Sequence, residues 1–190
     1  GVLGFYELNR IVGQLITIFF IVAIINAINF IDGIDGLAIS IFCLFVVLFE
    51  LLSSADTKFL NLSVILISSI IPLYYYNYKR KNKVFLGDSG SLFLGGVVSI
   101  YVIHILSQDY IIDPLFDVHK ILFVLSILLY PIIDIIRIVM LRLYNKKSPF
   151  VADKNHIHHI LYNRLDNHSL VVLSIILTSG LFFGIIHLIF

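Results

Sequence analysis

The sequence predicts an all-α fold, a polytopic transmembrane helical bundle, and three observations support this. Hydrophobic residues make up 59% of the 190 positions and charged residues only 13%, which is too little charge for the surface of a soluble globular protein. Several apolar runs approach the roughly 20 residues that a helix needs to cross a ~30 Å hydrocarbon layer. Strict alternation of apolar and polar residues is absent, so helices are favoured over a membrane barrel.

Six apolar stretches account for about six spans. They run from 11 to 30, 37 to 52, 60 to 76, 91 to 106, 121 to 141 and 170 to 190. The second and fourth are short, which leaves a tilted or a re-entrant course open for both. No repeat or long linker separates them, so residues 1–190 are expected to form a single integral membrane domain. The opening "GVLGFYELN" has neither an initiating Met nor a signal peptide, and we expect the chain to be the C-terminal portion of a longer protein.

Basic residues fall on one side of the predicted bundle. The third loop contains Lys79, Arg80, Lys81 and Lys83, and the fifth contains Arg142, Lys146, Lys147, Lys154 and Arg164. The positive-inside rule therefore predicts that the odd-numbered loops are cytoplasmic and that both chain ends are outside. We expect a multi-pass protein of the inner (plasma) membrane. The net charge of +1 carries little information, and nucleic acid is not expected as a partner.

A polar motif, "NAINFIDGIDGLA", follows the first apolar stretch. Its polar members are Asn26, Asn29, Asp32 and Asp35. A single Asp-Gly pair is ordinary turn chemistry, because glycine adopts backbone conformations that other residues resist. Two such pairs after Asn-x-x-Asn at a bilayer boundary instead indicate a functional site, since ionisable groups at membrane depth usually line one.

The third loop repeats this pattern in "KRKNKVFLGDSGSLFLGG", where Asp88 lies between Gly87 and Gly90. Asp88 or Ser89 is expected to cap the following helix, and the lysines to anchor the loop to anionic lipid. Capping leaves room for a second role, because free N–H groups at a helix N-terminus beside an aspartate suit a phosphate and its Mg²⁺.

The fifth loop, "MLRLYNKKSPFVADKNHIHHILYNRL", is the most polar. It contains Arg142, then Asp153, and ends in a histidine cluster formed by His156, His158 and His159. The cluster is open to a zinc interpretation, but the chain has no nearby cysteine and no His-Glu-x-x-His. A diphosphate with a divalent cation fits the basic and imidazole side chains better. Within the fifth stretch, Asp134 and Arg137 lie one turn apart, either as an ion pair that only orients helices or as part of the site.

Together these residues resemble a known family. "NAINFIDGIDGLA", "FLGDSGSLFLGG" and "SPFVADKNHIHHIL" are similar, in this order and on one membrane face, to motifs of the polyprenyl-phosphate N-acetylhexosamine-1-phosphate transferases. The resemblance covers about Asn26 to Leu161. The "HIHH" form resembles the GlcNAc-1-phosphate transferases that begin O-antigen, common antigen or teichoic acid synthesis. The peptidoglycan branch, which transfers phospho-MurNAc-pentapeptide, typically has three consecutive histidines and remains the alternative.

The resemblance implies a reaction and a set of site residues. A UDP-N-acetylhexosamine gives its sugar-1-phosphate to a polyprenyl phosphate such as undecaprenyl phosphate, UMP is released, and Mg²⁺ or Mn²⁺ is required. The implied catalytic residues are Asp32, Asp35, Asp88, His158 and His159, with Asp88 and Asp35 as metal ligands. The implied substrate-binding residues are Asn26, Asn29, Arg142 and His156. A homodimer is left open.

Departures from the family pattern limit these expectations. Relatives carry an Asp-Asp motif upstream of "NAINFIDGIDGLA", and nothing in residues 1–26 matches it. We therefore expect the chain to contain most of the donor and metal site but only part of the acceptor chemistry. A catalytically incomplete homologue stays open as an alternative. "VADK" replaces the more usual Pro-Asp-Arg. A transporter would place polar residues along several spans rather than at one face. A CDP-alcohol phosphotransferase would continue Asp-Gly-x-x-Ala with Arg, whereas Ile39 follows Ala38.

Overall fold

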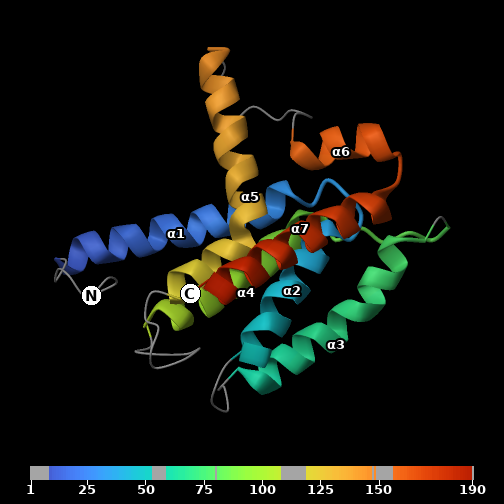
Figure 1. Cartoon of the computed structure of the whole chain (residues 1–190). Helices are drawn as coiled ribbons and strands as arrows, with labels where there is room; N and C mark the ends of the chain where they lie inside the picture. Colours follow the sequence, from blue (N-terminus) through green and yellow to red (C-terminus); the bar gives the residue numbers. More distant parts are fainter. Residues whose placement is uncertain are drawn as a thin grey trace.

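The protein is an all-helical membrane protein, as the sequence predicts. The computed structural model describes residues 9–52, 59–79, 81–107, 119–146, 148 and 156–189. Its helices are α1 (Arg10–Phe30), α2 (Leu37–Leu52), α3 (Leu60–Asn77), α4 (Gly87–Ser107), α5 (His119–Tyr144), α6 (Ile157–Leu165) and α7 (His168–Ile189) (Figure 1). Five of them, α1, α3, α4, α5 and α7, are long and apolar enough to cross a membrane, whereas α2 has only 16 residues.

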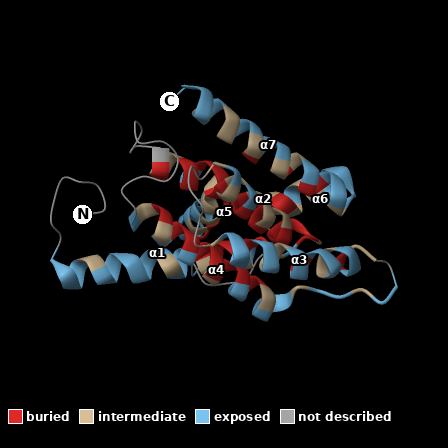
Figure 2. Ribbon diagram, turned by 90° about the horizontal axis from the view of Figure 1, so that it is seen from below, coloured by how far each residue is buried: buried red, intermediate tan, exposed pale blue. Residues whose placement is uncertain are grey.

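The core lies around α2, which is the most apolar helix. One face of α2 is fully buried and includes Phe42, Phe45 and Phe49. Tyr101 of α4 meets Phe45 and Phe49 edge to face, with ring centroids 6.4 and 5.2 Å apart. The N-terminal half of α1 and the outer face of α7 are instead exposed (Figure 2) and apolar. Because these helices are hydrophobic on their exposed sides, lipid is their natural solvent.

Helix α1 packs most extensively against α4. Gly95 makes this approach possible, since a Cβ built at Gly95 would lie 2.7 Å from the Cα of Ile25 and 3.1 Å from its carbonyl oxygen. Small residues allow helix backbones to approach closely in membranes. This contact brings the C-terminal end of α1, with the first polar motif, beside the N-terminal end of α4, which carries Asp88.

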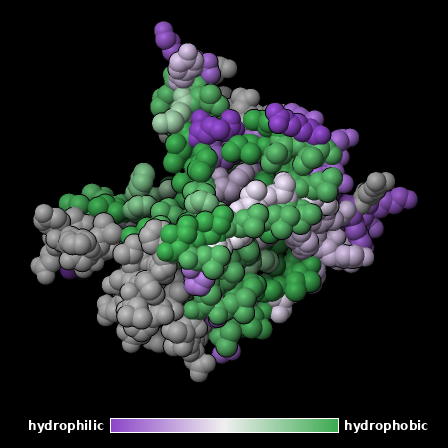
Figure 3. All heavy atoms as spheres, in the orientation of Figure 1, coloured by the Kyte–Doolittle hydropathy of each residue, from purple (hydrophilic) through white to green (hydrophobic). Residues whose placement is uncertain are grey.

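Helix α5 bends in the middle and α6 follows it. Pro131 lies inside α5, where it removes a backbone hydrogen bond, and Figure 1 shows the upper half of the helix rising away from the bundle. The sequence analysis placed no helix in the fifth loop, but Ile157–Leu165 forms the nine-residue helix α6. Hydrophobic residues cover most of the visible face, while hydrophilic residues gather near the end of α5, on α6 and around the loop after α3 (Figure 3).

Candidate active site

The loop from 31 to 36 between α1 and α2 places the first two aspartates. Helix α1 ends at Phe30 and α2 begins at Leu37. Gly36 has φ +76°, and a Cβ there would lie 2.5 Å from the hydroxyl oxygen of Tyr78, the residue that follows α3. A side chain at position 36 is therefore both strained and obstructed. The loop turns tightly against Tyr78, and burial raises the pKa of that hydroxyl further above its usual value.

The packing of α1 on α4 joins the first two motifs. The amide Nδ2 of Asn29 donates to Ser91 Oγ at 2.8 Å and lies 3.3 Å from Asp88 Oδ1. Asp88 is exposed in the first turn of α4, where the helix dipole favours a carboxylate. Asn26, one turn earlier in α1, donates instead to the carbonyl of Val22 in its own helix. The two asparagines belong to the same Asn-x-x-Asn motif but have different surroundings in the structure.

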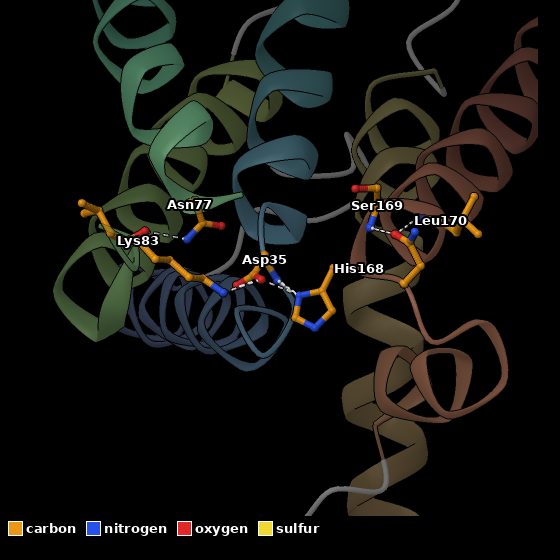
Figure 4. Close-up of polar contacts among 8 residues, drawn as sticks. Asp35, Asn77, Lys83, His168, Ser169 and Leu170 are labelled. Atoms are coloured by element: carbon orange, nitrogen blue, oxygen red, sulfur yellow. Dashed lines mark hydrogen bonds and ion pairs between the residues drawn. The ribbon is translucent and has the colours of Figure 1, made fainter. Parts of the chain in front are cut away.

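Asp32 and Asp35 also differ in their surroundings. Asp35 Oδ2 lies 2.6 Å from Lys83 Nζ and 2.6 Å from His168 Nδ1 (Figure 4). Its charge is thus balanced by Lys83 of the loop before α4, and His168, the first residue of α7, contacts the same carboxylate oxygen. Asp32 is half-buried, and its pKa is raised to about 7, first by burial and then by the negative charges of Asp88 and Asp35. An unneutralised carboxylate beside Asp88 is suited to a divalent cation.

The histidine cluster reaches the Asp-Gly loop from α6. A Cβ built at Gly33 would lie 2.8 Å from His158 Nε2 and 3.2 Å from His159 Nε2, so both rings touch this glycine. His158 is fully buried, and its Nδ1 lies 3.0 Å from the hydroxyl of Tyr130. Its Nε2 has no hydrogen-bond partner within the described part of the chain. Burial lowers the pKa of His158 to about 3, with further contributions from His159 and His156, so the imidazole is neutral at pH 7.

His156 takes a separate position beside an apolar groove between α1 and α5. The groove has a volume of about 340 Å³. Its apolar walls include Phe19, Phe20 and Phe30 of α1 and Leu128, Ile132 and Val139 of α5. Its polar lining residues are Asn26, Arg142 and His156, from the C-terminal parts of α1 and α5 and the start of α6. Arg142 and His156 are each only 6% exposed. An apolar groove with buried basic side chains suits a molecule with a hydrocarbon chain and an anionic end.

The structure therefore groups the predicted residues into two neighbouring sites. Asn29, Asp32, Asp35 and Asp88 share one site with His158 and His159, and Asn26, Arg142 and His156 line the groove. Asp153 lies outside the described residues.

The sequence analysis missed three contributing residues and left the role of a fourth open. Lys83 was read only as a basic loop residue, and Tyr130 and His168 were not considered. His168 stands at the start of the last apolar stretch, on the face that carries the motifs, and this position was the available signal. Asp134 was expected to pair with Arg137, and a 3.2 Å ion pair joins them. Asp134 also binds His156, which the spacing along the chain did not reveal.

Comparisons with known proteins agree with the family resemblance of the motifs. The family model described as "Glycosyl transferase family 4" matches residues 1–106. The chain is 36% identical over 169 residues to the "Probable undecaprenyl-phosphate N-acetylglucosaminyl 1-phosphate transferase" of Bacillus subtilis, a match that covers 88% of this chain and 45% of that protein. It is 32% identical over 196 residues to the "Decaprenyl-phosphate N-acetylglucosaminephosphotransferase" of Mycolicibacterium smegmatis, with 95% of this chain and 48% of that protein covered.

A third relative matches a shorter part. The "Undecaprenyl-phosphate alpha-N-acetylglucosaminyl 1-phosphate transferase" of Pasteurella multocida is 34% identical over 104 residues, which is 52% of this chain and 27% of that protein. The chain spans about half the length, or less, of these curated relatives. No solved structure matches the chain significantly. From the family match over more than half of its length, the chain belongs to glycosyl transferase family 4, as a homologue of the polyprenyl-phosphate GlcNAc-1-phosphate transferases.

Proposed function

We propose that the protein transfers N-acetylhexosamine-1-phosphate, most simply GlcNAc-1-phosphate, from a UDP-sugar to a polyprenyl phosphate such as undecaprenyl phosphate and releases UMP. This step would start the synthesis of a cell-surface glycan. One observation carries the proposal: the acidic cluster with Asp88, the histidines of α6 and the apolar groove adjoin one another at one end of the bundle. The printed names of the relatives describe transferases of this kind.

The chemistry explains why such a site is needed. Attack of a lipid phosphate on the β-phosphorus of a UDP-sugar brings two anions together, so most of the catalysis comes from positioning and from electrostatic stabilisation. The histidines touching Gly33 lie where they would meet the diphosphate or the sugar. His158 would do so as a neutral imidazole that uses Nε2, because its Nδ1 is engaged with Tyr130.

The donor set fits a magnesium or manganese ion. Hard divalent cations prefer carboxylate and amide oxygens, and Asp32 and Asp88 supply them beside Asn29. The raised pKa of Asp32 is consistent with this fit, since it reflects first burial and then the negative charges of Asp88 and Asp35, which a bound cation would offset. We place Asp88 and Asp32 as the principal ligands, while Asp35 adds charge from its bridge to Lys83 and His168. When bound, the cation would offset charge on the diphosphate.

The acceptor is proposed to enter the groove between α1 and α5. A polyprenyl chain would lie along the phenylalanine and leucine walls, and its phosphate would meet Arg142 and His156. Lipid can reach this groove from the membrane, because α1 exposes Phe19 and Phe20 at its surface, 68% and 56% respectively.

The site is proposed to face the cytoplasm. The loops that build it carry the basic residues, including Lys83 and Arg142, and the positive-inside rule assigns such loops to the cytoplasmic side. Membership of a bacterial lipid-linked pathway would then place the protein in the plasma membrane, with the nucleotide sugar supplied from the cell interior.

A direct assay tests the proposal. Membranes containing the full-length protein are incubated with radiolabelled UDP-GlcNAc, undecaprenyl phosphate and Mg²⁺, and the label is followed into lipid while UMP is measured. We expect transfer that depends on both the lipid phosphate and the cation. Transfer from UDP-MurNAc-pentapeptide in place of UDP-GlcNAc would instead assign the peptidoglycan reaction. Absence of transfer from either donor would contradict the proposed activity.

A further inference from the structure

The carboxylate of Asp134 holds several groups in place at once. It lies in α5, one turn after Pro131, and is 1% exposed. Its Oδ2 is 2.6 Å from Nδ1 of His156, and its Oδ1 accepts a 2.8 Å hydrogen bond from the backbone N–H of Ile157, the first residue of α6. Arg137 lies 3.2 Å from the same Oδ1. One buried side chain therefore fixes both the His156 ring and the start of α6.

In this structure, the distance between Asp134 and His156 is that of a hydrogen bond. Asp134, His156 and His158 offer ligand atoms that lie within 4.8 Å of one another. Two ligands about 2.0–2.1 Å from a tetrahedral zinc ion would be separated by about 3.3 Å. The 2.6 Å between Asp134 and His156 is shorter than this and is typical of a charge-assisted hydrogen bond. His158 Nδ1 is engaged with the Tyr130 hydroxyl.

This geometry sets the tautomer of His156. An ionised carboxylate only accepts hydrogen bonds, so the ring must carry its proton on Nδ1 and donate it to Asp134. The remaining nitrogen, Nε2, is then the ring atom available to a ligand, and His156 lines the groove together with Arg142. A carboxylate that orients a histidine in this way is a recurring device in enzyme sites.

We propose that Asp134 is a positioning residue whose carboxylate accepts the Nδ1–H of His156, so that in the complex the Nε2–H of the doubly protonated ring donates to the phosphate of the lipid in the groove. The inference rests on the proposed function, because it takes the groove as the site of the polyprenyl phosphate. It assigns Asp134 a role beyond its ion pair with Arg137. It also divides the histidines, since His156 would serve the acceptor lipid while His158 and His159 adjoin the Asp-Gly loop.

The variant Asp134→Asn separates this role from a purely structural one. Asparagine keeps an oxygen that can accept from Ile157 N–H, but it presents an amide donor where the carboxylate oxygen accepts from His156. The ring would have to move its proton to Nε2 to stay hydrogen-bonded. The matched control is Arg137→Gln, which removes the ion pair of Asp134 but leaves its contact with His156.

Two measurements on the full chain in lipid nanodiscs test the proposal. The first is the ¹⁵N spectrum of labelled imidazoles, with His156 assigned by comparison with His156→Gln. The second is binding of geranylgeranyl phosphate compared with geranylgeraniol, which has the same chain without the phosphate. We expect an Nδ1–H tautomer in the wild type and in Arg137→Gln and an Nε2–H tautomer in Asp134→Asn. We expect Asp134→Asn to weaken binding of the phosphate about tenfold or more without affecting the alcohol, because the neutral Nε2–H of the variant lacks the charge that the Asp134 carboxylate stabilises on the wild-type ring.

The outcomes are distinguishable. A wild-type His156 without a proton on Nδ1 overturns the proposal even if Asp134→Asn does not fold. Equal loss of phosphate binding in Asp134→Asn and Arg137→Gln also overturns it, because the ion pair would then be the important feature. A wild-type protein that binds phosphate and alcohol equally removes the acceptor site on which the inference rests. Stoichiometric zinc in the wild type, lost in Asp134→Asn, would show a metal site instead.

Discussion

At the residue scale, the carboxylates of the two Asp-Gly pairs are chemically equivalent in the sequence but not in the structure. Asp35 is bridged to Lys83 and His168, each at 2.6 Å. For Asp32, burial and then the negative charges of Asp88 and Asp35 raise the pKa to about 7. Unbalanced negative charge favours cation binding, so our proposal takes Asp32 and Asp88 rather than Asp35 as the principal metal ligands.

The first prediction concerns Asp88. Replacing it with asparagine keeps its size but removes the charge that a hard cation needs, so Mn²⁺ binding should weaken by about tenfold or more, which corresponds to ~1.4 kcal/mol. Electron paramagnetic resonance of Mn²⁺ with the detergent-solubilised protein measures this. Asp166→Asn is the matched control, because Asp166 lies in the exposed left-handed cap after α6, at φ 48°, where asparagine is tolerated. Unchanged Mn²⁺ affinity in Asp88→Asn would refute the assignment.

The second prediction is a pH dependence that originates from Asp32. Because its pKa is raised to about 7, Asp32 carries a proton in about half of the molecules at pH 7, and metal binding must displace it. Affinity for Mg²⁺ should therefore fall as the pH drops below 7, by up to about tenfold per pH unit, and level off above the pKa. Titrations across this range measure the slope, which should flatten in Asp32→Asn. An identical slope in the variant would assign the proton to another group.

The sequence predicted those residues of the site that lie within short motifs, and it did not predict their partners from distant parts of the chain. Asn29 and Asp88 were predicted and lie 3.3 Å apart, although 59 positions separate them. The partners of Asp35 were not predicted, because Lys83 and His168 are 48 and 133 positions away from it. The distribution of basic residues along the sequence indicates that they share a membrane face. Which basic side chain contacts which carboxylate depends on how the helices pack.

At the element scale, hydropathy predicted six of the described helices well and missed α6 for a physical reason. The expected stretch 37–52 is α2 without change, and α4 begins four residues earlier than expected, at Gly87. Helix α6 has low hydropathy, and the His156 side chain before it makes no capping hydrogen bond. Its first turn is capped from outside by Asp134 of α5. A tertiary contact of this kind leaves no signal in the local sequence.

The third prediction concerns the contact between α1 and α4. Gly95→Ala would place a methyl group 2.7 Å from the Cα of Ile25, and such overpacking typically costs about 1–3 kcal/mol. Because this contact also sets the distance between Asn29 and Asp88, the variant should melt earlier in detergent and bind Mn²⁺ more weakly. Gly96→Ala is the neighbouring control, since nothing lies within 4 Å of its Cβ. Equal behaviour of the two variants would mean that the close approach does not matter.

At the scale of the whole molecule, hydrophilic residues gather near the end of α5, on α6 and around the loop after α3, and hydrophobic residues cover most of the visible face (Figure 3). Helix α4 has 21 residues, about 31 Å at 1.5 Å per residue, and so matches a ~30 Å hydrocarbon layer. The ends of α1, α3 and α5 and the starts of α4 and α7 then lie on the same side. A single membrane face would receive the nucleotide sugar, the cation and the lipid phosphate.

The fourth prediction tests this arrangement by cysteine labelling. Cys43 is the only cysteine, so Cys43→Ser gives a background without thiols. Single cysteines at Lys81 and Asn163, both exposed near the site, should react from the cytoplasmic side of intact vesicles. A cysteine at Ser107, at the other end of α4, should react only from the opposite side. If the cysteines at positions 81 and 107 are labelled from the same side, α4 does not span the membrane and the loops of the site do not share one membrane face.

The last prediction tests whether the two ends of the chain build one ligand site. His158 and His159 touch Gly33, although about 125 residues separate them in the sequence, so removing the two rings should weaken the ligand that the Asp-Gly loop binds. Hydrogen bonds to an ionised phosphate are worth roughly 1.5–3 kcal/mol each, and the double variant His158→Ala with His159→Ala should therefore weaken Mg²⁺-dependent UDP-GlcNAc binding strongly. Asn26→Ala should weaken it less, because the Asn26 amide is neutral and donates within its own helix.

Calorimetry on the protein in detergent measures these affinities separately from turnover. This separation is necessary because a role of the histidines in the chemical step would change turnover as well as binding. His187→Ala is the matched control, since His187 stacks on Phe183 near the far end of α7. Because His158 is neutral above a pKa of about 3, its contribution to binding should not change between about pH 6 and about pH 8. If the double variant binds UDP-GlcNAc as the wild type does, the histidines do not face the nucleotide sugar, and their contact with Gly33 serves only to pack α6 against the Asp-Gly loop.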